Sequence, residues 1–258
     1  MIDPKQLAAI ETFHAASDAV HDVLGDTTEW GSSGQRDGQY AVDLDADAVC
    51  IERLHSAGYR VLSEESGITG AASGPVVVVD PLDGSTNASR GVPWFATALC
   101  LVDDDGPAAA LVADHSSGVR FTAIRGHGAA CDDVAISVSA CGRLADALVG
   151  VSGLPTHHYG WSQFRAFGAA ALDICAVASG SLDAWCDMLV DAHGVWDYLA
   201  STLVCTEAGG VVGEVMGREL CVLDPAARRT PVVAASQSLF DAVLRERLGS
   251  GRLEGTGR

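Results

Sequence analysis

The sequence predicts an α/β fold in which helices and strands form layers. Two N-terminal segments, residues 4–24 and 43–57, carry apolar side chains at helical spacing. Residues 76–79 are four consecutive valines, which is typical of a buried strand. Helical and extended patterns both recur through the chain, which is typical of an α/β protein.

The length and charge of the chain limit its class. It has 258 residues, 48% of them hydrophobic, which suits one large domain or two tightly joined halves. We expect one compact unit with an N-terminal half (1–143) and a C-terminal half (144–258). The net charge of −18 argues against nucleic acid or an anionic membrane as a partner. A phosphate site on such a protein needs cations to receive its ligand.

The eight cysteines form no Cys-x-x-Cys pair and lie mostly within apolar runs. We therefore expect free thiols in a reducing cytoplasm, and no zinc site. The chain does not begin with a basic segment followed by an apolar one, and its apolar runs are shorter than the roughly 20 residues that span a bilayer. The sequence predicts a cytoplasmic protein without a signal peptide or membrane span.

The N-terminal half is predicted to begin with two helices and continue as strands. Asp3 and Pro4 are typical of a helix start, and Gly58 of a helix end, so the helices cover 4–24 and 43–57 with a loop over 25–38 between them. The acidic run at 103–105 is expected to be a hairpin turn. The predicted strands cover 59–62, 76–79, 94–102, 108–113, 119–124 and 134–138.

The C-terminal half is predicted to alternate between strands and helices. His157 and His158 fall in a loop over 154–160, where they could contact a substrate or simply face solvent. Residues 249–258 are polar and glycine-rich and are expected to be disordered. The predicted elements are strands over 147–151 and 181–187, helices over 165–179, 197–208 and 236–248, and closing strands around 211–215 and 232–235.

The valine strand is followed by the segment richest in side chains that could bind a metal or a phosphate. Residues 76–87 are VVVVDPLDGSTN, so two carboxylates, Asp80 and Asp83, stand three residues apart at a strand end. Gly84 permits a turn, and the three residues after it are favoured at helix starts. Carboxylates can bind a divalent cation, and helix-start amides can bind an anion. The segment suggests metal-assisted chemistry on a phosphate, although Asp-x-x-Asp-Gly alone is common in ordinary turns.

Two distant segments strengthen this interpretation. Residues 63–67 are SEESG after a short strand, and residues 195–200 are VWDYLA at a helix start. Together with DPLDGSTN at 80–87 and TEAGG at 206–210, they resemble the inositol monophosphatase family of magnesium-dependent, lithium-sensitive phosphatases. The family motif is Asp-Pro-(Ile/Leu)-Asp-Gly-Thr-x-Asn, and one position differs here, Ser85 in place of Thr. The resemblance extends over nearly the whole chain.

The resemblance implies a fold, an assembly and a reaction. The fold is the alternating α-β-α-β-α sandwich of the inositol monophosphatase and fructose-1,6-bisphosphatase type. The protein is expected to be a homodimer that acts on a small phosphorylated substrate. Two to three Mg²⁺ ions would assist the attack of a water molecule on the phosphate.

Particular residues match the metal ligands of the family. The first Mg²⁺ would be bound by Glu64, Asp80 and the backbone carbonyl of Leu82. Asp80, Asp83 and Asp197 would bind the second, and a third would lie near Glu64 through waters. An acid at a helix start, as at Asp197, is otherwise often only a cap.

Catalytic and lid residues follow from the same match. Glu64 and the Ser85 hydroxyl would orient and deprotonate the water. The family lid carries Asp-x-x-Thr-x-x-Asp, and here Asp37 and Asp43 match the acids while Tyr40 replaces Thr. Asp43 is a candidate for holding metal-bound water.

Other matched residues would bind the substrate. The amides of Gly84 and Ser85 would hold phosphate oxygens. Gly168 and Ala170 would lie against the substrate, as would Asp197. For the acid that binds substrate hydroxyls, Asp187 is the candidate and Asp191 its rival, because the segment before Asp197 is longer than is usual in the family.

Three functions remain open from the sequence. The first is hydrolysis of inositol monophosphate or a related polyol or sugar phosphate. The second is the same chemistry on histidinol phosphate, a 3′-phosphonucleotide or fructose bisphosphate. The third is a catalytically weak homologue with a regulatory or binding role, which the intact set of acids disfavours.

Overall fold

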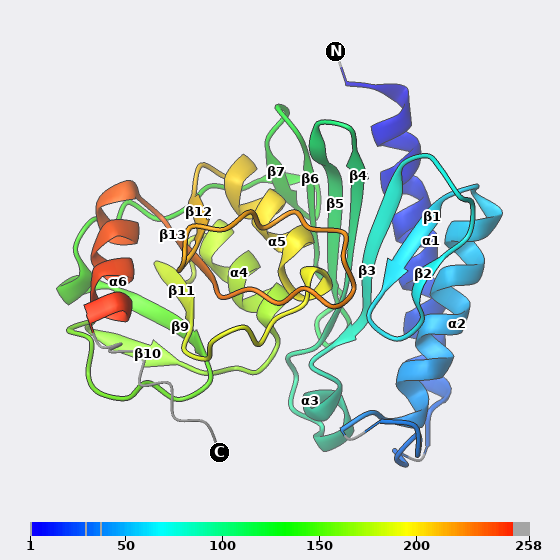
Figure 1. Cartoon of the computed structure of the whole chain (residues 1–258), viewed down its shortest axis with the longest axis horizontal. Helices are drawn as coiled ribbons and strands as arrows, with labels where there is room; N and C mark the ends of the chain where they lie inside the picture. Colours follow the sequence, from blue (N-terminus) through cyan, green and yellow to red (C-terminus); the bar gives the residue numbers. More distant parts are fainter. Residues whose placement is uncertain (1, 29, 37, 250–258) are drawn as a thin grey trace.

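Two β-sheets alternate with three helical layers in the computed structural model, which describes residues 2–28, 30–36 and 38–249 (Figure 1). This arrangement confirms the layered α/β fold that the sequence predicts. Besides a short 3₁₀ turn at Leu144–Asp146, the helices are α1 (Pro4–Asp26), α2 (Ala41–Ser56), α3 (Ser85–Arg90), α4 (Ala170–Ala178), α5 (Val195–Glu207) and α6 (Gln237–Gly249).

The larger sheet has eight strands and is mostly antiparallel. Only its β1–β3 pair is parallel. In spatial order the strands are β2 (Gly67–Thr69), β1 (Arg60–Ser63), β3 (Val76–Asp83), β4 (Ala96–Asp103), β5 (Gly106–Asp114), β6 (Arg120–Ile124), β7 (Ala129–Cys131) and β8 (Val134–Ala135).

The smaller sheet has five strands and begins with a parallel trio. The order along this sheet is β10 (Gln163–Arg165), β9 (Leu148–Ser152), β11 (Ala184–Asp187), β13 (Pro231–Ala234) and β12 (Val211–Glu214). The last two strands run antiparallel to their neighbours.

Helices cover both faces of each sheet (Figure 1). α1 and α2 pack on the outer face of the larger sheet, α4 and α5 lie between the sheets, and α6 covers the outer face of the smaller one. The valine run shows how β3 serves two layers: Val76 and Val78 belong to the core between the sheets, while Val77 and Val79 face α1 and α2. Side-chain alternation along a strand explains why both faces are apolar.

The predicted halves share the central helical layer. The larger sheet uses residues 60–135 and the smaller one residues 148–234. α4 and α5 contact both sheets, so the two parts pack around common helices. The boundary between residues 143 and 144 stays a prediction.

Several predicted elements have different bounds in the structure. The helix predicted over 165–179 begins only at Ala170, because Gly168 has φ +90°, which no right-handed helix accommodates, and residues 163–165 pair as β10. The strand predicted over 134–138 is paired only at Val134–Ala135. β2, β7 and β10 were not predicted, because each is only three residues long and so short a strand shows no recognisable alternation of apolar and polar residues. Gly249, the first residue of the predicted disordered tail, is instead the last residue of α6; the rest of that tail and Asp37 lie outside the described residues.

Other predictions are confirmed. Asp3 caps α1, and the acidic run at 103–105 is the turn between antiparallel β4 and β5. All eight cysteines are free. Among the helices described, none is both long and apolar enough to cross a bilayer.

A glycine in β9 provides a test of the packing between the sheets. A Cβ at Gly150 would lie 2.8 Å from Trp185 Cδ1 and 2.9 Å from Leu182 Cδ1. We predict that Gly150→Ala lowers the free energy of unfolding by about 1–3 kcal/mol through overpacking. Gly25 is in a helix with open space around it, so Gly25→Ala is the control and should raise stability by about 0.5–1 kcal/mol. Urea unfolding measures both, and an unchanged Gly150→Ala would contradict the packing described.

Candidate active site

A bulge in β3 brings two carboxylates to one side of the larger sheet. Residues three apart on a regular strand face opposite sides. Asp80 pairs with Ala98 and Asp83 pairs with Ala96, so three steps on β3 match two on β4. Pro81, which has no N–H to donate, lies within this bulge. Asp80 and Asp83 therefore face the same side, toward the core between the sheets, to which Ala96 and Ala98 belong.

Polar contacts fix the bulge. The Leu82 amide donates to Asp80 Oδ1 at 3.0 Å, and the Thr97 hydroxyl donates to the Pro81 carbonyl at 2.7 Å. His115 Nε2 lies 2.7 Å from Thr97 Oγ1 and must donate to it, because the Thr97 proton is already used. Burial lowers the pKa of His115 to about 4, so the ring is neutral. The hydrogen bond from Thr97 of β4 thus stabilises the bulge that carries Asp80 and Asp83.

Two further acids, on other elements, lie close to Asp80. Glu64 directly follows β1, the parallel neighbour of β3, and Asp197 is the third residue of α5. Asp197 Oδ2 accepts a hydrogen bond from the Gly194 amide at 2.7 Å. One carboxylate oxygen each from Glu64, Asp80 and Asp197 lie within 4.8 Å of one another. This spacing and the all-oxygen donor set fit a hard divalent cation such as Mg²⁺.

Asp83 completes the group that we call the acidic cluster: Glu64, Asp80, Asp83 and Asp197. Its Oδ2 accepts a hydrogen bond from the Ala171 amide at the start of α4, at 2.7 Å. Asp83 is thereby held beside α4, next to the other three acids.

The pKa values of the carboxyls in the acidic cluster are raised. Burial is the largest cause, and repulsion between the carboxylates is the second for most of them. The pKa of Glu64 rises to about 8 through burial and the nearby charge of Asp197, and the pKa of Asp83 rises to about 8 for the same two reasons. The pKa of Asp80 lies well above its usual value because of burial and Glu64. Burial raises the pKa of Asp197 to about 6. Four carboxylates cannot all be charged in this space without a cation.

Two cavities border the acidic cluster. The lid-side cavity has a volume of about 150 Å³. It is lined by four predicted site residues (Asp43, Glu64, Leu82 and Ser85) and by residues of the loop before α2. Its lining is Arg36, Gly38, Gln39, Asp43, Glu64, Glu65, Leu82 and Ser85. The α5-side cavity, of about 270 Å³, is lined by Asp83, Ser152, Gly168, Ala169, Ala170, Asp173, Ala192, His193 and Asp197.

The loop before α2 is attached to the site through Glu65 and Tyr40. Arg36 donates a hydrogen bond to Glu65 Oε2 at 2.6 Å, and the Gln39 side-chain amide donates to the same oxygen. Glu65 therefore binds the loop before α2 and is not a member of the acidic cluster. The Tyr40 hydroxyl accepts a hydrogen bond from Ser89 of α3 at 3.0 Å. Tyr40, which replaces the family Thr, therefore links this loop to α3.

Asp43 lies at the same edge of the cluster. Its Oδ2 accepts a hydrogen bond from the Tyr40 amide at 2.8 Å. Burial raises the pKa of Asp43 to about 6, against the opposing effects of the Tyr40 amide and the Ser85 hydroxyl. Asp43 is thus a buried acid next to the predicted catalytic hydroxyl.

Of the residues predicted to contact the substrate, Ser85, Gly168, Ala170 and Asp197 line one of the two cavities, whereas Gly84 and Asp187 line neither. Gly84 has φ +82° and precedes Ser85, the first residue of α3; a Cβ on Gly84 would lie 2.9 Å from the Trp94 carbonyl. Ser85 lines the lid-side cavity, whereas Gly168 and Ala170 line the α5-side cavity. Only glycine fits position 84, because both the backbone and the space require it.

The candidates for binding substrate hydroxyls do not reach either cavity. Asp187 is completely buried and bonds His193 Nδ1, at 2.7 Å. Asp191 is exposed and forms an ion pair with Arg218. His157 and His158 are likewise absent from the lining of both cavities.

Sequence reasoning missed three polar residues that line the α5-side cavity: Ser152, Asp173 and His193. Asp173 accepts hydrogen bonds from the indoles of Trp94 at 2.8 Å and Trp185 at 3.1 Å, and burial raises its pKa to about 7. It thereby fixes α4, whose amide holds Asp83. These partners lie on distant elements, so no local motif marks the three residues.

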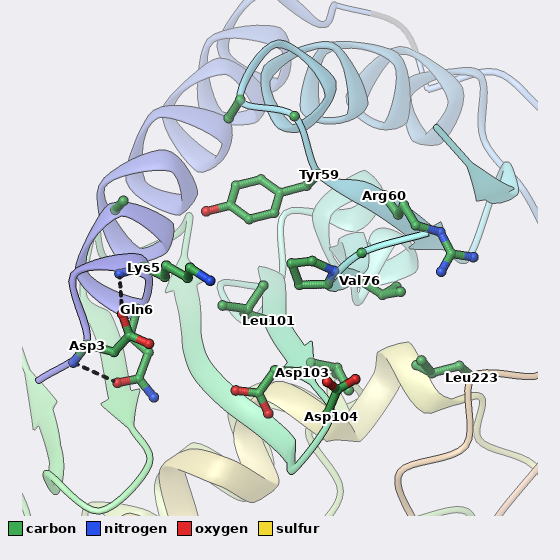
Figure 2. Close-up of a pocket in the computed structure, with 16 residues that line it drawn as sticks. Asp3, Lys5, Gln6, Tyr59, Arg60, Val76, Leu101, Asp103, Asp104 and Leu223 are labelled. Carbon is green, nitrogen blue, oxygen red and sulfur yellow. Dashed lines mark hydrogen bonds between the residues drawn. The ribbon is translucent and has the colours of Figure 1, made fainter. Parts of the chain in front are cut away.

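A larger cavity lies at the start of α1 and is separate from the acidic cluster. It has a volume of about 710 Å³ and lies between the start of α1, the loop before β1 and the end of β4 (Figure 2). Lys5 and Tyr59 extend over it in Figure 2, with Asp103 and Asp104 on its opposite side. None of the predicted site residues lines it, so volume alone does not mark the active site.

Comparisons with known proteins agree with this geometry. A fructose-1,6-bisphosphatase/inositol-1-monophosphatase of Methanothermobacter thermautotrophicus is 33% identical over 217 residues, covering 75% of this chain and 77% of the relative. An inositol-1-monophosphatase of Mesorhizobium japonicum is 32% identical, covering 68% and 71%. The crystal structure of the extragenic suppressor protein suhB from Bartonella henselae superposes with a TM-score of 0.79 at 27% identity, covering 96% of this chain and 100% of that one.

The profile of a whole family also matches. The sequence profile described as the inositol monophosphatase family covers residues 5–250, which is almost the entire chain. The fold, the acidic cluster and these matches agree, and the chain belongs to the inositol monophosphatase family.

Proposed function

We propose that this protein hydrolyses a small phosphate monoester in a reaction that depends on Mg²⁺. The observation that carries the proposal is the convergence of four carboxylates between two cavities, with Asp80 buried and Glu64, Asp83 and Asp197 partly buried. Metal-dependent phosphatase activity is the activity of the family, and the all-oxygen donor set favours Mg²⁺ as the metal. Glu64, Asp80, Asp83, Asp197 and the Leu82 carbonyl would hold two to three ions.

Each residue of the site has a separate role in the proposed reaction. When bound, Mg²⁺ would supply positive charge for the phosphate dianion and increase the acidity of the attacking water. Glu64 and the Ser85 hydroxyl would orient that water and accept its proton, with Asp43 beside them at the lid-side cavity. The amides of Gly84 and Ser85 would hold phosphate oxygens.

The alcohol part of the substrate would lie in the α5-side cavity, against Gly168 and Ala170 and next to Asp197. An inositol monophosphate, or a related polyol or sugar phosphate, suits the names of the relatives. Histidinol phosphate, a 3′-phosphonucleotide and fructose bisphosphate are the alternative substrates for the same chemistry. Lithium inhibition, a homodimeric assembly and a cytoplasmic location belong to this proposal. A purely regulatory role would not require all four acids.

Removing one cluster charge tests the proposal. We predict that Asp83→Asn lowers Mg²⁺-dependent phosphate release at least about 100-fold, because a lost ligand misplaces the charge that stabilises the transition state. The control is Asp104→Asn, in the exposed hairpin turn, which should leave the rate within about twofold. Phosphate release from a panel of phosphomonoesters, with Mg²⁺ and with EDTA, measures both. Equal rates for Asp83→Asn and the unaltered protein would refute the metal assignment.

The raised pKa values predict how stability depends on pH without metal. Because burial raises the pKa of Glu64 and Asp83 to about 8 and that of Asp197 to about 6, the folded state binds more protons than the unfolded state. Metal-free protein should therefore lose stability as pH rises from about 4 to 8, whereas saturating Mg²⁺ should restore it above pH 7.

Thermal unfolding in EDTA and in Mg²⁺ across this pH range measures the effect. Asp83→Asn removes one of the titrating groups, so its metal-free stability should fall less steeply with pH. Metal-free protein that became more stable between pH 6 and 9 would contradict the arrangement of the cluster.

A further inference from the structure

Three side chains form a chain of polar contacts at the wall of the α5-side cavity. His193 Nδ1 lies 2.7 Å from Asp187 Oδ2, and His193 Nε2 lies 3.4 Å from Ser152 Oγ. Asp187 is completely buried, and its other oxygen accepts a hydrogen bond from the Leu189 amide at 2.8 Å. His193 and Ser152 line the cavity, and Asp187 does not. The imidazole therefore stands between the buried carboxylate and the cavity.

The fold fixes the position of each member. Ser152 and Asp187 are register partners at the ends of the parallel strands β9 and β11. The backbone of His193 pairs with Arg229 in an isolated bridge, with His193 O accepting from the Arg229 amide at 2.9 Å. The imidazole packs edge-on against Trp185, with ring centroids 5.6 Å apart. A ring held from three directions is preorganised to meet a ligand.

The carboxylate determines which atoms of the ring are available. Asp187 accepts the proton of Nδ1, so the ring presents Nε2 toward Ser152 and the cavity. The contact between Nε2 and Ser152 Oγ is long, at 3.4 Å, and both atoms keep capacity for a further hydrogen bond. A hydroxyl group, which can both donate and accept, matches this pair of atoms.

The cavity also locates the pair relative to the reaction. Asp83 and Asp197 of the acidic cluster line the same cavity as His193 and Ser152. If the phosphate binds at the cluster, the alcohol part of the ester lies in the cavity and faces Nε2. His193 would then contact the part of the substrate that differs from one phosphomonoester to another.

The charge of the cavity restricts that alcohol further. Its lining includes three carboxyl groups and one histidine, and no lysine or arginine among the described residues. A second phosphate on the substrate would lie in this cavity without a permanent cation to neutralise it. An uncharged alcohol that carries hydroxyl groups suits the lining better.

We propose that His193, oriented by Asp187 and assisted by Ser152, is the residue that selects substrates by binding a hydroxyl of an uncharged polyhydroxy alcohol. The inference rests on the proposed phosphatase function and adds a specificity residue to it. Asp187 is a positioning residue in this scheme, because it acts on the substrate only through the imidazole.

Two substrates that differ only in hydroxyl groups test the proposal: inositol 1-phosphate and cyclohexyl phosphate. The unaltered protein should prefer inositol 1-phosphate in kcat/KM by about tenfold or more, the effect of well-placed hydrogen bonds to a substrate. His193→Asn keeps a nitrogen near Nδ1 for Asp187 but lacks Nε2. It should lose about tenfold on inositol 1-phosphate, mainly in KM, and stay within about twofold on cyclohexyl phosphate.

The matched control is His193→Gln, whose amide reaches the position of Nε2 and should recover part of the preference for inositol 1-phosphate. An equal loss on both substrates in His193→Asn would show a structural role and overturn the proposal. So would an unaltered protein that hydrolyses cyclohexyl phosphate as well as inositol 1-phosphate, while leaving the phosphatase function intact. Absence of Mg²⁺-dependent hydrolysis of either compound and of the wider panel would instead refute the proposed function itself, and with it this inference.

Fructose 1,6-bisphosphate tests the charge argument separately. We expect its kcat/KM to be at least about tenfold below that of inositol 1-phosphate, because the second phosphate is not neutralised in the cavity. A bisphosphate hydrolysed as efficiently as the monophosphate would show that the alcohol need not be uncharged.

Discussion

The convergence of four carboxylates at one place, with Asp80 buried and the other three partly buried, is the constraint on which the rest of the structure depends. The bulge in β3 turns Asp80 and Asp83 to the same side, and β1 and α5 add Glu64 and Asp197. Such a cluster is unfavourable unless protons or cations balance its charge. The surroundings hold the acids in place rather than relieve their repulsion, which is the arrangement expected of a cation site.

The central helical layer links this cluster to both sheets. The start of α4 provides the amide that holds Asp83, and α5 carries Asp197. Asp173 anchors α4 through the indoles of Trp94, which precedes β4, and Trp185 in β11. The same Trp185 packs against His193, so the acidic cluster and the wall of the α5-side cavity share one support. This connection explains why a site at one edge of the larger sheet also depends on the smaller sheet.

Local patterns in the sequence predicted most helices and strands, and the family motifs predicted the layers and the acids. The valine run predicts β3, and the motifs around Glu64, Asp80 and Asp197 predict residues that the structure brings together. What could not be predicted depends on contacts between distant segments. Asp187 looks like a substrate ligand in sequence, but the loop before α5 places His193 in front of it. The late start of α4 likewise depends on the backbone of one residue, Gly168.

The most direct test of the account is anomalous diffraction from crystals soaked in Mn²⁺, a substitute for Mg²⁺ whose position can be identified from its scattering. The account predicts peaks among the carboxylates of Glu64, Asp80 and Asp197, extending toward Asp83. Crystals of Asp80→Asn should lose them. The absence of any peak at the cluster, or peaks only at exposed acids such as those of the 103–105 turn, would contradict the claim that the acidic cluster is a metal site.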